Sequence, residues 1–317
     1  MKIIALFPVK NDAWILPVVI PQLKRFAEEI LVLDGGSDDG TRELLLKAGV
    51  KVRNQDPNNL NYSSWRQELL SWGRECGGTH FVWLDADEAF TSQFLETWKE
   101  RLSSMSPGEK LALPWLCLWK SPYVYRDDSS IWSNLYKDFV FCDDGVSSFG
   151  KEVLHEGRTP GKNDGGNWIR IPQEEGGVLH FQFVPFERFQ VKQAFMRCRE
   201  HVLKTASPKR INHKYAETLD TKKAKTVPID KKWLAGISNL DTIEDTTDTW
   251  HRRETLNYFN RYGIEYFEPL QIWHIKEYKD LFVEKMGRTP RAEVYHPLLV
   301  KANKIRHKIR SLLKSRS

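Results

Sequence analysis

Over its first 105 residues the chain alternates between short apolar runs and segments with helical periodicity. The apolar runs lie at residues 2–8, 30–33, 51–53 and 81–84, and helices are expected at about 12–27, after 41, and at 63–76. Such alternation predicts a mostly parallel sheet whose strands are joined by right-handed helical crossovers. Ligands of such sheets bind beyond the carboxyl ends of the strands. Polar residues that follow different strands should therefore meet at one edge.

The stretch FVWLDADEAF, residues 81–90, carries the strongest chemical signal. An apolar run long enough for a buried strand leads directly into Asp85, Asp87 and Glu88. Three carboxylates at the end of a buried strand repel one another, and a bound divalent cation relieves that repulsion most directly. The alternative is a loop in which aspartate serves as a helix cap, although Thr91 already offers a cap for the next helix.

Composition indicates a soluble globular protein. Aromatic residues make up 12% and charged residues 28% of 317 residues, and no apolar run reaches the roughly 18 residues of a membrane span. The four cysteines are widely spaced and form no CxxC pair, which favours a reducing cytoplasm. The net charge of +6 comes from residues 301–317, which hold seven of the 48 basic residues and no acid.

Residues 298–317 predict a basic amphipathic helix, and two interpretations of it stay open. It is a solvated terminus, or it binds an anionic membrane surface and places a cytoplasmic protein at the inner face of the membrane. Binding of nucleic acid is not expected, because the remaining chain has 41 basic and 42 acidic residues and supplies no basic groove.

After residue 105 the pattern changes. Strands are expected at 110–119, 135–142 and 177–184, and helices at 186–205 and 250–262, while 266–274 reads as a small strand or a packing segment. We therefore expect a domain at 1–205 and a largely helical extension at 206–317.

Three motifs resemble the donor-binding half of glycosyltransferase family 2. They are PVKND at residues 8–12, ILVLDGGSDDGT at 30–41, and FVWLDADE at 81–88; further along, VLHE and GGVLHFQF resemble the lipopolysaccharide-core-type branch. The resemblance implies the GT-A fold, a Rossmann-like α/β domain with a mostly parallel central sheet, here with a mainly helical C-terminal extension.

The resemblance also implies roles for individual residues. Asp34 would contact the uracil or ribose of a UDP-sugar, and Arg66 would approach the nucleotide phosphates or base. Asp85 would touch ribose or metal, and Asp87 would bind Mn²⁺ or Mg²⁺ at the donor diphosphate. Three more residues would line the same pocket: Pro8, Asn11 and Asp12. The chain departs from the family pattern at Lys10, Asp12 and Gly35, where Tyr, Glu and a second Asp are usual.

The acceptor hydroxyl needs a base, and the metal needs further ligands. Glu156 is the first candidate for the base, with Asp143 or Asp144 in reserve and a surface charge as the alternative. His180 could complete the metal shell or be a core histidine bonded to backbone, and His155 is a weaker candidate.

These residues favour a metal-dependent, inverting glycosyltransferase that adds one sugar to a glycan or lipid-linked acceptor in surface polysaccharide or lipopolysaccharide synthesis. The glutamine–arginine–tryptophan motif of processive synthases is absent. A nucleotidyltransferase is the first alternative, but it should carry a glycine-rich basic loop after the first strand. The second alternative is a non-catalytic sugar- or nucleotide-binding module, in which Asp87→Asn would leave ligand affinity largely intact.

Overall fold

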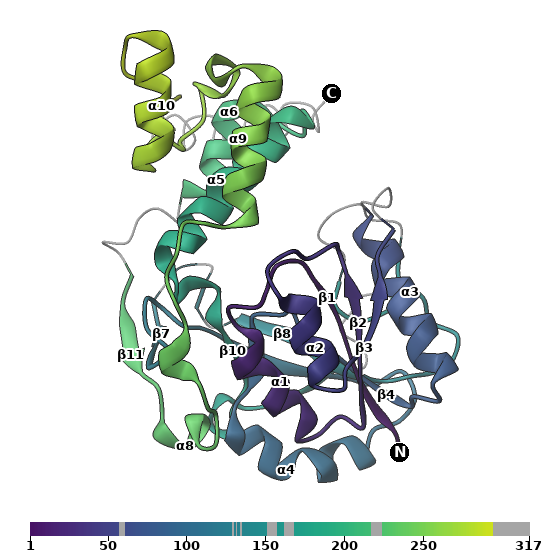
Figure 1. Ribbon diagram of the computed structural model, residues 1–317. Helices are drawn as coiled ribbons and strands as arrows, with labels where there is room; N and C mark the ends of the chain where they lie inside the picture. Colours follow the sequence, from purple (N-terminus) through teal and green to yellow (C-terminus); the bar gives the residue numbers. More distant parts are fainter. Residues whose placement is uncertain are drawn as a thin grey trace, which may run out of the picture. The chain divides into compact units, whose positions relative to one another are not determined.

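The computed structural model describes residues 1–56, 61–128, 130, 132–133, 135–150, 157–161, 168–216 and 224–293, without the side chains of Trp98 and Lys99. The chain forms two compact units (Figure 1). The sheet unit comprises Met1–Phe186 and Ala224–Thr246, and the helical unit comprises Glu187–Lys223 and Thr247–Ser317. Both units contain residues from each side of residue 205, the boundary expected from the sequence. The units are groups of residues in mutual contact, and the division into domains at residue 205 stays a prediction.

The sheet unit is built on one large mixed sheet. Its described strands are β1 (Ile3–Val9), β2 (Glu29–Asp34), β3 (Lys51–Asn54), β4 (His80–Trp83), β5 (Glu88–Phe90), β6 (Lys110–Cys117), β8 (Leu135–Cys142), β9 (Trp168–Arg170) and β10 (Val178–His180). They run in the order β3-β2-β1-β4-β8-β6-β10-β5, and β9 pairs with β6. The first four are mutually parallel, and β8 runs antiparallel to β4. The predicted α/β class is therefore confirmed.

Three helices make the crossovers between the parallel strands: α1 (Leu16–Lys24), α2 (Thr41–Lys47) and α3 (Tyr62–Glu75) (Figure 1). Helix α3 contacts β1 and β2, and its apolar residues Leu69, Leu70 and Trp72 share one core with Ile4 and Leu6 of β1. The alternate residues of β1 are equally buried. Both faces of this strand are covered, as expected where helical crossovers flank a parallel sheet.

Residues 224–246 complete the sheet unit. Strand β11 (Thr226–Pro228) pairs antiparallel with β7 (Val124–Arg126). The short helix α8 (Lys231–Leu234) contacts α4 (Ser92–Ser103), which begins after the N-cap Thr91. The amide of Gln22 in α1 donates to the Gly236 carbonyl at 3.0 Å. A segment that the sequence assigns to the extension thus packs on three elements of the first 130 residues.

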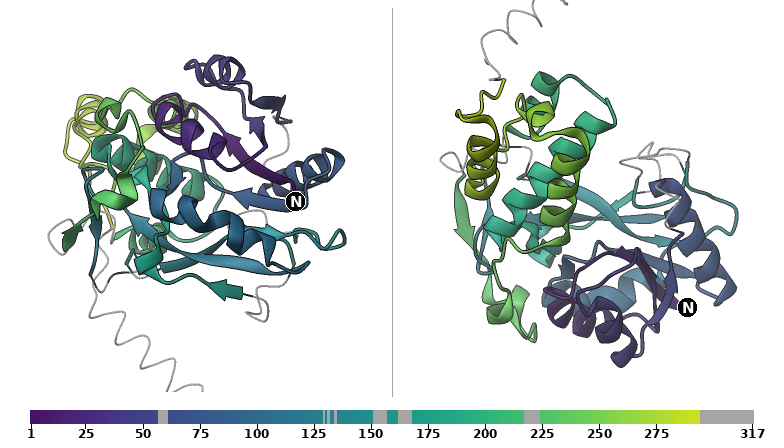
Figure 2. Two further views of the ribbon diagram at one scale, coloured as in Figure 1. Left: turned by 90° about the horizontal axis from the view of Figure 1, so that it is seen from below. Right: turned by 45° about the horizontal axis from the view of Figure 1, so that its top comes forward.

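The helical unit contains four helices in its described part: α5 (Phe186–Val202), α6 (Pro208–Lys214), α9 (Trp250–Tyr262) and α10 (Lys276–Met286), green to yellow in Figure 2. A short 3-10 turn, Ile264–Phe267, follows α9. These elements bury one core, and its largest fully buried members include Tyr278 and Phe282. Among the described residues, no helix combines the length and apolar character needed to cross a lipid bilayer.

Two expected elements differ in the structure, and a third takes one of its two expected forms. The first helix begins at Leu16, because the Asp12 carbonyl first accepts from the amides of Ile15 and Leu16 in a turn. The strand expected at 177–184 ends at His180 and passes into a 3-10 turn, Phe181–Phe183. Of the two forms expected for residues 266–274, the structure has the packing segment: the backbone forms turns, and the apolar side chains pack into the helical core.

Candidate active site

The strand order reverses between β1 and β4. The chain runs from β1 outward to β2 and β3, then returns across β1 to β4 on the other side. Such a reversal is the point at which open α/β sheets bind ligands. The residues that follow β1, β2 and β4 lie at this edge.

Pro8 lies near the end of β1, beyond the last residue that pairs with β4. The Val9 carbonyl accepts a hydrogen bond from the Gly35 amide on the β2 side. The backbone nitrogen and carbonyl of the neighbouring Pro8 therefore point to the β4 side. The β4 pairing has already ended there, at Leu6 with Trp83. The missing N–H of proline therefore breaks no hydrogen bond of the sheet.

Asn11 and Asp12 fasten the turn after β1 to the loop after β2. The Asn11 side chain donates to an Asp38 carboxylate oxygen at 2.7 Å and accepts from the Asp38 amide at 2.8 Å. The Asp12 amide donates to Thr41 Oγ1 at 2.8 Å. Asn11 has a φ of +58°, a conformation that asparagine tolerates better than most residues. These contacts fix the shape of the loop pair.

Asp34 ends β2 with its side chain buried. One carboxylate oxygen accepts from the amide of Ser37 at 2.9 Å and from its hydroxyl at 2.7 Å. The other lies 3.4 Å from an Arg42 guanidinium nitrogen. Arg42 also donates to Asn54 at the end of β3. The carboxylate is thus held by hydrogen-bond donors.

Arg66 projects from the first turns of α3. Its guanidinium carbon lies 4.5 Å from the ring centroid of Trp83, the last residue of β4. Stacking on an aromatic face holds the guanidinium where β4 ends. Arg66 is also one of the cations whose charge lowers the pKa of Asp85.

Asp85 and Glu88 are joined by Arg158. The guanidinium donates to Asp85 at 2.8 Å and to the two oxygens of Glu88 at 2.6 and 2.7 Å. Glu88 is fully buried and also accepts from Trp115 Nε1 at 2.6 Å and the Asp85 amide at 2.8 Å. Glu88 and Arg158 thus organise the turn that carries Asp85 and Asp87.

Electrostatics acts in opposite directions on Asp85 and Glu88. Burial raises the pKa of Asp85, but the neighbouring cations, Arg158 first, outweigh it and bring the value down to about 2. Burial and the adjacent aspartates raise the pKa of Glu88. Its hydrogen bonds oppose that shift, because each is donated to the carboxylate and an oxygen that only accepts is stabilised in its ionised form.

Asp87 lies beside His180. An Asp87 carboxylate oxygen is 3.7 Å from His180 Nε2, and the Asp87 carbonyl accepts from the Phe181 amide at 2.8 Å. The antiparallel pairing of β5 with β10 places His180 opposite Glu88. The imidazole also stacks on Trp115 with the ring centroids 4.3 Å apart. The motif and the late histidine, 93 positions apart, thus meet through one strand pair.

The side chains of Asp85, Asp87 and His180 offer some, but not all, of the ligands that a divalent cation needs. No group of three or more His, Cys, Asp or Glu side chains that could hold a metal ion occurs within the described residues. Mg²⁺ is commonly bound by one or two carboxylates together with substrate phosphates rather than by a protein cage. Two carboxylates and an imidazole fit that kind of shared site, whose remaining ligands come from the substrate.

Two of the three candidate bases fall within the described residues. Glu156 and His155 lie outside the described residues. Asp143 and Asp144 follow β8, where Cys142 pairs with His80, the first residue of β4. They sit at the edge opposite Asp85, so the expectation that either serves as reserve base is wrong.

Sequence reasoning did not single out Glu88, Trp115 or Arg158 as site residues. The sequence shows Glu88 only as one of three repelling acids, and Trp115 only as one of many aromatic residues. Arg158 gave no signal, because it stands in a polar loop where a buried arginine looks like an exposed one.

The fold is an α/β fold of the GT-A type. Its sheet is mostly parallel with helical crossovers, has polar residues at the point where the strand order reverses, and becomes mixed in its far half. Residues 5–104 match the sequence profile of the family described as glycosyl transferase family 2. The match makes this part of the chain, about a third of its length, similar to that family.

A curated relative and several solved structures are similar to parts of the chain. A TPR repeat-containing protein of Synechococcus elongatus is 32% identical over 104 residues, which cover 33% of this chain and 24% of that protein. The match thus spans about a quarter of that relative.

Among solved structures, S. aureus TarS has a TM-score of 0.34 and 15% identity, over 61% of this chain and 40% of that one. Glucosyl-3-phosphoglycerate synthase of Mycobacterium tuberculosis, solved with Mn²⁺, UDP and glucosyl-3-phosphoglycerate, has a TM-score of 0.26 and 18% identity, over 37% and 44% of the two chains. Mannosyl-3-phosphoglycerate synthase of Rubrobacter xylanophilus has a TM-score of 0.29 and 21% identity, over 38% and 41%. The similarity to glycosyl transferase family 2 therefore rests on the sequence match of residues 5–104.

Proposed function

We propose that this protein is a metal-dependent glycosyltransferase. It would move one sugar, with inversion, from a nucleotide-sugar, preferably a UDP-sugar, to a hydroxyl of a glycan or lipid-linked acceptor in surface polysaccharide or lipopolysaccharide synthesis. The observation that carries the proposal is the meeting of Asp34, Asp85 and Asp87 at the strand-order reversal of a family 2 domain.

The proposed donor site divides into two parts. Asp34, with Pro8, Asn11 and Asp12 shaping the adjoining loops, would take the base and ribose. The diphosphate would lie near Asp85 and Asp87, where Arg66 supplies positive charge at the end of β4. Cationic side chains beside a departing diphosphate stabilise the negative charge that develops on it.

Asp85, Asp87 and His180 would hold Mn²⁺ or Mg²⁺ together with oxygens of the donor. When bound, such an ion supplies Lewis-acid stabilisation of the leaving nucleoside diphosphate. The protein's part is to keep the carboxylates ionised and oriented. Arg158 does so for Asp85, since its positive charge favours the ionised carboxylate and its hydrogen bond fixes the rotamer.

Glu156 stays our proposed base for the acceptor hydroxyl. A carboxylate within hydrogen-bond reach accepts the proton as the new glycosidic bond forms. Glu156→Gln should then abolish transfer to an acceptor while donor binding persists.

Residues 298–317, which lie outside the described residues, are proposed to bring the protein to an anionic membrane surface at the cytoplasmic face. Flotation of the full chain with phosphatidylglycerol vesicles, but not with phosphatidylcholine vesicles, would support this. Flotation that is unchanged after removal of the tail would contradict it.

The test of the enzyme reading is donor hydrolysis. The protein is incubated with each of a panel of nucleotide-sugars and Mn²⁺ or Mg²⁺, and free nucleoside diphosphate is measured. We expect slow release from one donor, lost with a chelator and reduced at least 100-fold in Asp87→Asn. Asp248→Asn, on an exposed residue of the helical unit, is the matched control and should behave as wild type.

If no donor is hydrolysed, calorimetry with the same donors decides. Metal-dependent binding that is weakened by Asp87→Asn would keep the site and indicate that the acceptor is required. Absence of binding by every donor would refute the assignment of this site.

A further inference from the structure

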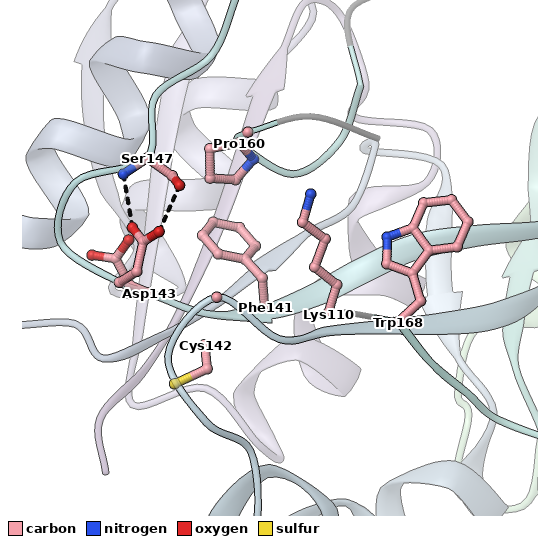
Figure 3. Close-up of a pocket in the computed structure, with 10 residues that line it drawn as sticks. Lys110, Phe141, Cys142, Asp143, Ser147, Pro160 and Trp168 are labelled. Atoms are coloured by element: carbon pink, nitrogen blue, oxygen red, sulfur yellow. Dashed lines mark hydrogen bonds between the residues drawn. The ribbon is translucent and has the colours of Figure 1, made fainter. Parts of the chain in front are cut away.

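A pocket lies at the edge of the sheet opposite the candidate active site. It has a volume of about 190 Å³, and its lining includes Lys110, Phe141, Asp144, Pro160 and Trp168 (Figure 3). Lys110 begins β6 and pairs with Phe141 on one side and Trp168 on the other. Since the next residue of β8 pairs with the first residue of β4, this pocket and Asp85 are separated by the whole length of β4.

Lys110 is a buried cation that lacks a partner among the described residues. The residue is 8% exposed, and its Nζ is buried without a hydrogen bond or an ion pair. Figure 3 shows the side chain extending into the space between Phe141, Pro160 and Trp168. An ammonium removed from water without a partner is strongly destabilising. A bound group that accepts hydrogen bonds would remove that penalty.

The nearby acids do not fill this role. Both oxygens of Asp143 are taken by Arg74, each at 2.8 Å. Asp144 accepts from the Val146 amide and from the amide and hydroxyl of Ser147. Arg74 thus neutralises Asp143, and among the described residues of the pocket lining Lys110 is left as the one cation that a bound anion could meet.

The size and walls of the pocket limit the ligand further. A cavity of roughly 150 Å³ holds a benzene ring, whereas pockets for drug-sized ligands begin at roughly 300 Å³. Phe141, Pro160 and Trp168 offer apolar surface, and the side chains of Asp144 and Ser147 make part of the remaining lining polar. An aromatic face next to hydrogen-bonding groups suits a ring that is apolar on its faces and carries hydroxyls on its rim.

We propose that this pocket binds a six-membered sugar ring bearing one carboxylate, a uronic acid, with the carboxylate on Lys110 Nζ and a ring face against Trp168. The site is separate from the proposed donor site, and its existence does not depend on the proposed transferase activity.

The test is isothermal titration calorimetry of the full chain with D-glucuronate, D-glucose and inorganic phosphate, without nucleotide or metal. We expect glucuronate to bind at least tenfold more tightly than either comparator. Lys110→Met should weaken glucuronate binding at least tenfold, and Trp168→Ala should weaken it severalfold. Lys47→Met removes an exposed lysine of α2 and should leave binding unchanged.

Folding of the variant is checked by its melting temperature without ligand. Lys110→Met should melt no lower than wild type, because it removes a buried charge and retains most of the aliphatic stem. No glucuronate binding up to 20 mM, equal binding by Lys110→Met, or a preference for glucose or phosphate would each overturn the proposal.

Discussion

At the scale of single residues, the ion pair between Glu88 and Arg158 holds the motif turn together. Arg158 is buried and bridges Asp85 to the fully buried Glu88. Neither partner reaches water easily, so each depends on the other for its stability in the folded protein. Removing one partner of such a buried pair costs much stability, because the other is left without a counter-charge. Removing both partners together costs less.

Arg158→Met should therefore lower the free energy of unfolding by about 3–5 kcal/mol, because Asp85 and Glu88 would lose their buried partner and Glu88 would have to take up a proton to stay buried. The double variant Arg158→Met with Glu88→Gln should recover a large part of that loss, since the amide keeps an acceptor for Trp115. Urea unfolding of wild type, the two single variants and the double variant gives the coupling free energy between Arg158 and Glu88. A single-variant loss under about 1 kcal/mol would show that the pair is not needed for stability.

The sequence marks some site residues better than others. Asp85 and Asp87 are visible because they end an apolar run, where acids are chemically unexpected. His180 is visible only as the end of another apolar segment, and its approach to Asp87 depends on the pairing of β5 with β10. The local sequence cannot predict that pairing, because strands of three residues are too short to show a periodic pattern.

At the scale of elements, α3 lies close to β4 at a glycine. A Cβ atom added to Gly73 would stand 2.4 Å from the Phe81 ring. Phe81 is fully buried, so the ring has little room to move away. The absence of a side chain at this helix position lets α3 approach the strand that leads to the motif.

Gly73→Ala should reduce the free energy of unfolding by about 1–3 kcal/mol through overpacking. This is opposite in sign to the gain of about 1 kcal/mol that alanine brings in an exposed helix interior. Ser71→Ala, on the exposed side of the same helix, is the control and should change stability little. Chemical denaturation measures both, and a stabilised Gly73→Ala would mean that α3 can shift outward freely.

His80 makes the stability of β4 depend on pH. Burial lowers the pKa of this histidine, while an unfolded histidine titrates near its ordinary value of roughly 6.5. The unfolded chain therefore binds more protons as pH falls below about 6.5, and the folded state loses stability. His80→Asn should lose less stability than wild type between pH 7.5 and 5.5, as read from urea midpoints.

Other histidines change the comparison little, because they are present in both proteins. His201 in the helical unit also has a lowered pKa, and its contribution cancels in the difference. An equal loss in wild type and His80→Asn would show that His80 takes up its proton in the folded state without penalty.

At the scale of the whole molecule, the return of residues 224–246 to the sheet unit is the feature that the sequence concealed. The sequence of residues 224–246 is mostly polar and has no clear periodicity, although Trp233 within it is buried. The contacts that fix it, such as that between Gln22 and Gly236, join residues more than 200 positions apart. Local periodicity located the parallel strands but could not reveal where this segment packs.

Trp233→Ala should destabilise the sheet unit by about 3–5 kcal/mol, the usual cost of removing a buried tryptophan. Hydrogen exchange should accelerate at the amides of β7 and β11 and stay unchanged in α9 and α10. Phe282→Ala, in the helical core, is the reciprocal control. Equal acceleration in both units after either substitution would mean that they unfold as one.

The order of synthesis gives this discontinuity a further meaning. A ribosome releases residues 1–186 before the segment that closes the sheet unit exists, and it must first make the 37 residues of Glu187–Lys223. The helical unit is split in the same way, since α5 and α6 wait for α9 and α10 to cover their apolar faces. Each unit of the nascent chain therefore stays incomplete while the other is being extended. Exposed apolar surface in such an interval is what chaperones recognise.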